Sequence, residues 1–193
     1  MRTSTSLACV ALGITCGLAL AAAGPSLARF TAGLIGRGGR ASAPHAAPLA
    51  ATAQATWLAT WAASPQAAGV GAVPRGGLDD RTVRDVIYTS VGGTAIRVRI
   101  SNLYGTVALH IGAASVGTIL DGAGLLPGGT RALAFGQRGE RSVTIPAGGS
   151  VTSDPVSYNV PPLTELAVSL YLPVPTGLMT VHSLAQQDSY VAD

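Results

Sequence analysis

The chain has 193 residues, of which 48% are hydrophobic and 11% are charged, and its formal net charge is +3. This length fits one compact domain with tails. All basic residues are arginines spread along the sequence, whereas a nucleic-acid surface needs a dense basic patch to replace counterions on phosphates. The composition therefore argues against nucleic acid as a partner.

Residues 1–28 are typical of a cleavable export signal. Arg2 provides a short positive start, an apolar core runs from Leu7 to Ala23, and Ser26-Leu27-Ala28 offers small residues for cleavage, with an alternative cut after Ala23. The apolar stretch is close to the lower limit of about 17 residues for a membrane span. We therefore expect a secreted, extracellular protein, attached to a membrane only through an uncleaved signal.

The sequence predicts neither a metal nor a cofactor. Both cysteines, Cys9 and Cys16, lie inside the apolar core of the signal, so the processed chain would contain no thiol for a disulfide, a zinc site or a nucleophile. The acidic residues of the Gly- and Pro-containing turns form no calcium-loop pattern; they are Asp79, Asp80, Asp121 and Asp154. The glycine pairs lack the following helix and lysine of a phosphate-binding loop.

The region after the signal divides into a tether and a domain. Residues 29–55 are rich in Ala, Gly and Pro without periodicity, which predicts a flexible, disordered tether. From 56 to 193, short β-favouring runs recur between Gly, Pro and Asp breaks. This pattern predicts an all-β fold, an antiparallel β-sandwich of jelly-roll-like type or a barrel. We expect strands near 57–62, 83–91, 95–101, 107–119, 131–136, 141–145, 156–160, 165–172 and 178–183.

The clearest local pattern lies between Arg81 and Gly105. Ile96, Val98 and Ile100 alternate with polar residues, as in a strand with one buried face. Gly92-Gly93 precedes this run, and glycine tolerates the positive φ values of two-residue turns. The sequence therefore predicts a β-hairpin over this range, with no nucleophile beside a base.

Several blocks together carry a family resemblance. Besides RTVRDVIYTSVGGTAIRVRISNLYG (81–105), they are WLATWAASPQ (57–66), SVTIPAG (142–148), SDP (153–155), LAVSLYLP (166–173) and HSLAQ (182–186). In this order and spacing they resemble the N-terminal part of secreted actinobacterial SGNH (GDSL-type) hydrolases, in which a β-sandwich precedes the catalytic α/β domain. The resemblance covers about residues 56–193 and implies an ester or carbohydrate-ester hydrolase.

The chain departs from that family at the catalytic blocks. The Gly-Asp-Ser nucleophile block, the Gly-x-Asn-Asp oxyanion block and the late Asp-x-x-His pair are absent. Asp188-Ser189 lacks the preceding glycine, which Gln187 replaces, and no strand-to-helix turn follows it. We therefore expect no catalytic residue here and an accessory domain, truncated before the catalytic blocks and inactive alone, whose partner is a catalytic SGNH domain in the full-length relative.

The candidate ligand-binding residues are Trp57 and Trp61. They are four positions apart, which on a strand places them on one face, where two exposed indoles would stack on a polysaccharide or acylated glycan; core packing is the commoner fate of such rings. The alternative function is thus a stand-alone secreted carbohydrate-binding or structural module. We expect His110 and His182 to be structural, because neither has a paired carboxylate and serine in its sequence context.

Overall fold

The computed structural model describes residues 15–20, 56–69, 71–74, 76–136, 138–184 and 186–193. Every regular element in these ranges is a β-strand, which confirms the all-β prediction. No helix in the described ranges is long and apolar enough to cross a membrane. The predicted tether and most of the predicted signal lie outside the described residues.

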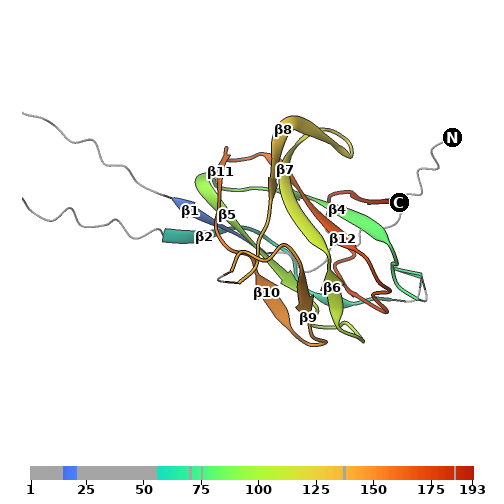
Figure 1. Ribbon diagram of the computed structural model, residues 1–193. Helices are drawn as coiled ribbons and strands as arrows, with labels where there is room; N and C mark the ends of the chain where they lie inside the picture. Colours follow the sequence, from blue (N-terminus) through green and yellow to red (C-terminus); the bar gives the residue numbers. More distant parts are fainter. Residues whose placement is uncertain (1–14, 21–55, 70, 75, 137, 185) are drawn as a thin grey trace, which may run out of the picture.

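The strands are short and follow one another closely along the chain (Figure 1). They are β1 (Thr15–Leu20), β2 (Thr56–Ala62), β3 (Gln66–Ala67), β4 (Arg81–Tyr88), β5 (Gly93–Ser101), β6 (Leu109–Ile111), β7 (Ala113–Asp121), β8 (Gly124–Ala132), β9 (Val143–Ile145), β10 (Ser150–Thr152), β11 (Val156–Val160), β12 (Glu165–Leu172), β13 (Thr180–Val181) and β14 (Ser189–Ala192).

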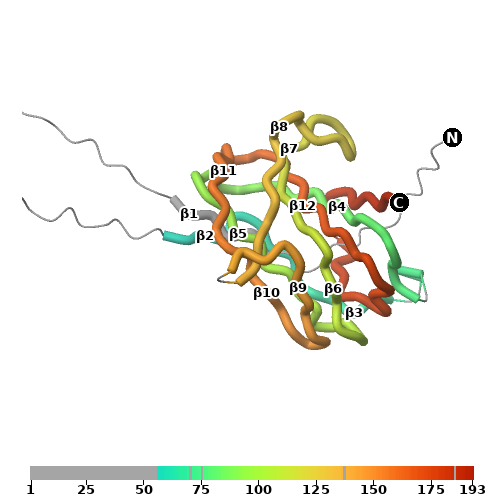
Figure 2. The backbone as a smooth tube through the Cα atoms, in the orientation of Figure 1, coloured from blue at the N-terminus to red at the C-terminus, as the bar shows by residue number. Residues whose placement is uncertain are grey.

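Two five-stranded antiparallel sheets form the body of the domain. One has the order β10-β5-β1-β2, with β11 also paired to β5, and the other has the order β14-β4-β12-β7-β8. Two small pairs, β3 with β13 and β6 with β9, complete the fold, and the tube view shows β3 and β6 close to the same end of the molecule (Figure 2). One core cluster contains apolar side chains from both large sheets, so the two sheets pack as a sandwich.

The core side chains come mainly from strands with alternating burial. Ile96, Val98 and Ile100 of β5 are fully buried, as their period-two pattern predicted. On β12 the opposite face is also covered: Ser169 is buried and its Oγ accepts a hydrogen bond from Arg84 Nε at 2.9 Å. β12 lies between β4 and β7, which explains why the polar side of its pattern is less exposed than its alternation suggested.

The predicted hairpin over 81–105 is wrong. β4 and β5 belong to different sheets and do not pair with each other, so the chain crosses between the sheets after Tyr88. Thr89 is bonded to the carbonyl of Thr164, which holds the crossing segment against a distant loop. Gly92 is required for a different reason from the one predicted: a Cβ there would lie 2.6 Å from the carbonyl oxygen of Val160.

Two further features differ from the sequence pattern. β8 runs through Pro127-Gly128-Gly129, between the strands expected near 107–119 and 131–136; Gly128 has a φ of 73°, and the β7–β8 register shifts nearby. The structure also contains β1, inside the predicted export signal, whereas the sequence predicted ordered structure only from Thr56. Residues 15–20 are uniformly apolar or small, so they lack the alternation that would distinguish a strand from the core of an export signal.

Asn102 ties the end of β5 to two other segments. Its side chain is buried, and Nδ2 lies 2.9 Å from the carbonyl oxygen of Val107, 3.1 Å from that of Ile145 and 3.2 Å from that of Pro146. Gly105 packs directly against the amide, since a Cβ there would stand 1.7 Å from Asn102 Oδ1. These contacts explain the Ser-Asn-Leu-Tyr-Gly sequence as a structural motif.

We predict that Asn102→Ala lowers the free energy of unfolding by about 1–3 kcal/mol, because it removes the buried amide donor that these carbonyls share. Urea denaturation followed by circular dichroism measures the change. The chain's other asparagine, Asn159, is exposed and provides the control, since Asn159→Ala should change stability by no more than about 0.5 kcal/mol. Equal effects of the two substitutions would contradict this role for Asn102.

Candidate functional site

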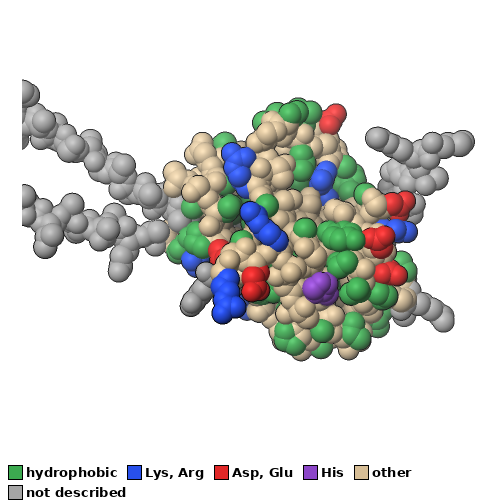
Figure 3. All heavy atoms as spheres, in the orientation of Figure 1, with side chains coloured by type: hydrophobic (Ala, Val, Ile, Leu, Met, Phe, Trp, Pro, Cys, Tyr) green, Lys and Arg blue, Asp and Glu red, His purple; other side chains and the backbone are tan. Residues whose placement is uncertain are grey.

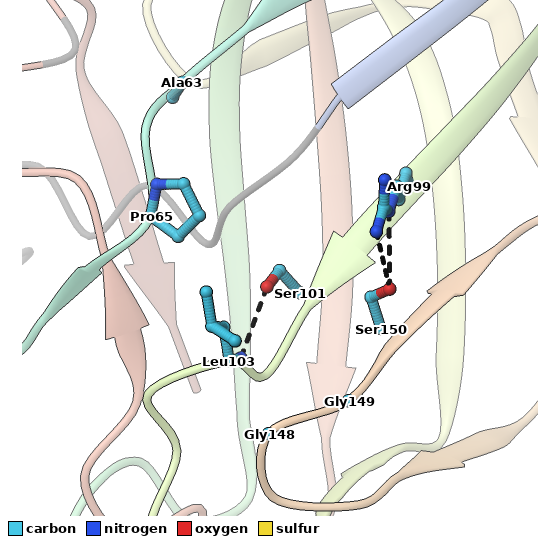
Figure 4. Close-up of a pocket in the computed structure, with 8 residues that line it drawn as sticks. All are labelled: Ala63, Pro65, Arg99, Ser101, Leu103, Gly148, Gly149 and Ser150. Carbon is cyan, nitrogen blue, oxygen red and sulfur yellow. Dashed lines mark hydrogen bonds between the residues drawn. The ribbon is translucent and has the colours of Figure 1, made fainter.

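A shallow hollow lies where the end of β5 meets β10 and the segment after β2 (Figure 4). Its volume is about 270 Å³. Pro65 and Leu103 form an apolar side, and Arg99 and Ser150 form a polar side opposite them. The remaining lining residues are Ala63, Ser101, Gly148 and Gly149.

Arg99 supplies the charge of this hollow. Its Nε and one terminal nitrogen lie 3.3 Å and 3.0 Å from Ser150 Oγ, which fixes the guanidinium beside the opening. No carboxylate in the described part of the chain forms a salt bridge with it; the ion pair found there joins Arg81 and Asp193. Such a hollow suits a small anionic or hydroxyl-rich group, because an oriented arginine binds oxygen anions well.

Trp57 and Trp61 lie on opposite sides of β2. The Arg97 guanidinium stacks over the Trp57 ring, 4.5 Å from its centroid, on the outward face of the sheet, whereas Trp61 packs against the core. A register shift in the β1–β2 ladder, where Thr60 is the extra residue, reverses the alternation between them. The expectation of one shared face is therefore corrected, and stacking of a ligand on either ring stays a prediction.

The two described histidines each make one hydrogen-bond contact at the surface. His110 Nδ1 lies 2.9 Å from Thr144 Oγ1, its cross-strand partner in the β6–β9 pair. His182 Nδ1 lies 2.9 Å from the carbonyl oxygen of Ser64. Both contacts orient the rings against the scaffold, and a structural role for the two histidines stays a prediction.

Ser189, of the Asp188-Ser189 pair, lies on β14. Its hydroxyl donates a hydrogen bond of 2.6 Å to Oδ1 of Asp85, a buried carboxylate on β4. An elbow of the hydrolase kind is a strand-to-helix turn, and the described residues contain no helix. The contact joins β14 to β4 and leaves the serine without the turn that would expose it to a substrate.

The described residues contain no cluster of possible metal ligands. No three His, Cys, Asp or Glu side chains gather there closely enough to hold a metal ion. Asp80 accepts a hydrogen bond of 2.8 Å from the hydroxyl of Tyr171. The sequence did not predict this pair or the Arg99 hollow, because both join residues that are far apart in the chain.

No protein-family model matches this chain, and no curated protein matches its sequence. The features that can bear on function are therefore those of the molecule itself: the Arg99 hollow, the Arg97–Trp57 stack, and the contacts among the blocks that carry the resemblance.

We predict that Tyr171 ionises above its ordinary pKa of about 10, because the hydrogen bond to Asp80 and the nearby negative charge favour the neutral phenol. The raised pKa means that the contact contributes fully below the unfolded-state pKa and is lost as pH rises through the folded-state pKa. Ultraviolet titration of the wild type and Tyr171→Phe isolates this group by difference.

The control is Asp80→Asn, which keeps a hydrogen-bond acceptor but removes the charge; asparagine also tolerates the φ of 49° found at this position. The pKa of Tyr171 should then fall toward its ordinary value. A Tyr171 component that titrates at or below about pH 10 in the wild type would contradict the assignment.

Proposed function

We propose that this chain is the N-terminal accessory β-sandwich of a secreted SGNH/GDSL-like ester hydrolase, working beside a domain that carries the catalytic groups. The observation that supports the proposal is spatial. The sequence blocks that carry the resemblance are distant from one another in the chain, yet they contact one another in the folded domain.

The first and last blocks meet at one end of the sandwich. β3 pairs with β13, which brings Gln66 opposite Val181, next to His182. His182 contacts the carbonyl of Ser64, and the hydroxyl of Ser183 donates to Gln66 Oε1 at 2.9 Å. The histidine and glutamine of these blocks thus have a scaffold role that accounts for their presence without chemistry.

The middle blocks are joined in the same way. Asn102 links its own block to the carbonyls of Ile145 and Pro146, and the backbone N–H of Val98 donates to Ser153 Oγ at 3.0 Å. β12 pairs with β4 along its whole length, from Leu172 opposite Arg81 to Glu165 opposite Tyr88. These contacts agree with blocks that belong to one folded domain, as the resemblance implies.

Such a domain supports hydrolysis without performing it. Acyl transfer needs a nucleophile, a base and oxyanion donors held together. In the described residues Ser189 is bonded to a buried carboxylate on a strand, and both histidines contact scaffold groups. We infer that the ester substrate is bound and cleaved on the catalytic domain, with this sandwich supporting it.

We predict that the purified chain does not hydrolyse short nitrophenyl esters above the buffer rate, because it lacks the assembled catalytic groups. The assay is spectrophotometric release of nitrophenolate, with Ser189→Ala as the comparison. Activity that disappeared in Ser189→Ala would show that this serine is a nucleophile.

The genomic test is independent: the DNA beyond the codon for Asp193 should encode Gly-Asp-Ser and, later, Asp-x-x-His. Unrelated genes there would count against the proposal.

A second function, carbohydrate binding, is favoured by the Arg97–Trp57 stack. Trp57 is half-buried on the outward face, with the Arg97 guanidinium over its ring. An arginine beside an aromatic ring suits an acidic or acylated glycan, since it offers both a stacking surface and hydrogen-bond donors.

If the domain binds glycans there, Trp57→Ala should weaken retention on insoluble polysaccharide by about thirtyfold, the effect of losing a central aromatic contact worth about 2 kcal/mol. Trp61→Ala is the matched control, because Trp61 packs against the core and its loss should lower the melting temperature. Retention of the wild type that survives Trp57→Ala unchanged would exclude this site.

A further inference from the structure

The position between β2 and β5 is filled by β1. All six residues of β1 have Cα partners on β2, and Thr15–Ala19 also have partners on β5, both ladders being antiparallel. β1 is therefore an internal strand, and β2 joins the sheet ladder through it (Figure 1). Without β1, the facing edges of β2 and β5 would carry a row of unpaired backbone groups.

The occupant of this position comes from the segment with export-signal character. Residues 15–20 lie within the apolar core that runs from Leu7 to Ala23. A core of this kind is recognised by the export machinery and removed with the signal. The same six residues thus have two incompatible uses, and processing would leave the strand position vacant.

β2, on one side of this position, makes contacts that do not involve β1. Thr60 Oγ1 donates to the carbonyl of Val91 at 2.8 Å and accepts from the Val91 N–H at 3.0 Å. The Thr60 carbonyl accepts from the N–H and the hydroxyl of Ser90 at 3.1 Å and 2.7 Å. Trp61 packs against the core, so β2 is fixed at this end whatever lies beside it.

β5 is held just as firmly from its other edge. β10 pairs with the Arg99–Ser101 end and β11 with the Gly93–Ile96 end, and Ile96, Val98 and Ile100 are fully buried. Arg97 of β5 reaches Trp57 of β2, and because β1 lies between these strands, this stack bridges the position on its outward face. If β1 left, β2 and β5 would still flank the empty position, and the Arg97–Trp57 stack would still lie over its outward face.

We propose that this position is a strand-binding site, filled here by residues 15–20 and open, once a signal is removed, to an extended segment of a partner polypeptide. Addition of a strand to paired edges is an established mode of peptide recognition, in which backbone hydrogen bonds give affinity and alternate side chains give specificity. This site depends on the sheet alone and does not require that the domain belong to an ester hydrolase.

The walls define the chemistry of the segment that fits. Positions opposite Ile96 and Val98 share the core face, so they take apolar residues. The position opposite Arg97 lies beneath the Arg97–Trp57 stack, so it takes a small residue; the chain places Gly17 there. The partner segment is therefore an uncharged strand with a small residue at its centre and apolar residues on either side.

The test uses the full chain with a protease site inserted between Ala28 and Arg29. After folding and cutting, a labelled synthetic peptide of residues 13–22 carrying Cys16→Ala is added as the probe. The chain's 2 tryptophans both lie in β2, next to this position, so a change in its occupancy should change their fluorescence. We expect the peptide to displace the cut fragment, to co-elute with the domain in gel filtration and to restore the fluorescence of the uncut chain.

Two peptide variants separate strand binding from nonspecific adhesion. Leu18→Pro should bind weaker by roughly tenfold or more, because proline removes a ladder donor at the centre of the strand. Gly17→Leu should bind weakly to the wild type and recover on the Arg97→Ala protein, while Arg99→Ala, on the same strand but bonded to Ser150, should not rescue it. Equal binding of the proline peptide, a fragment that cannot be displaced, or a vacated protein that binds no peptide would each overturn the proposal.

Discussion

The backbone of β5 must be hydrogen-bonded on both edges, and most of the sandwich is arranged to meet that requirement. Ile96, Val98 and Ile100 are fully buried, so unpaired N–H and C=O groups between them would lose water without gaining partners. β10 and β11 share one edge and β1 covers the other. Arg97 and Arg99 lie on β5, and Asn102 directly follows it. β5 therefore positions the Asn102 contacts, the Arg99 hollow and the Arg97–Trp57 stack.

Close approaches between segments explain why the chain has glycine, asparagine and serine at several positions where these residue types could suggest a functional site. Gly92 and Gly105 have space for a hydrogen atom but not for a methyl group, because backbone or amide atoms stand directly against them. Asn102 gathers carbonyls from two segments, and Ser189 holds β14 to β4 through Asp85. Polar side chains of this kind satisfy buried backbone and carboxylate groups.

The sequence predicted strands well where one period-two face is buried, as at 95–101 and 165–172, because that pattern depends only on local geometry. It did not predict which strands pair: β4 and β5 are adjacent in sequence but separate in space, since residues 89–91 bond to Thr164 and Thr60 instead. The opposite orientation of Trp57 and Trp61 depends on a register shift at Thr60, which long-range contacts fix. The Arg99 hollow likewise joins segments about fifty residues apart, and no local pattern encodes it.

β1 lies between β2 and β5 in the sheet, although residues 21–55 separate it from β2 in the sequence. β2 and the segment leading into β5 also make contacts that do not involve β1. The bonds of Thr60 to Ser90 and Val91, together with the Arg97–Trp57 stack, supply such contacts on the two sides of the same strand position. Because these contacts do not involve β1, they connect β2 to the rest of the domain in addition to the two ladders that β1 makes.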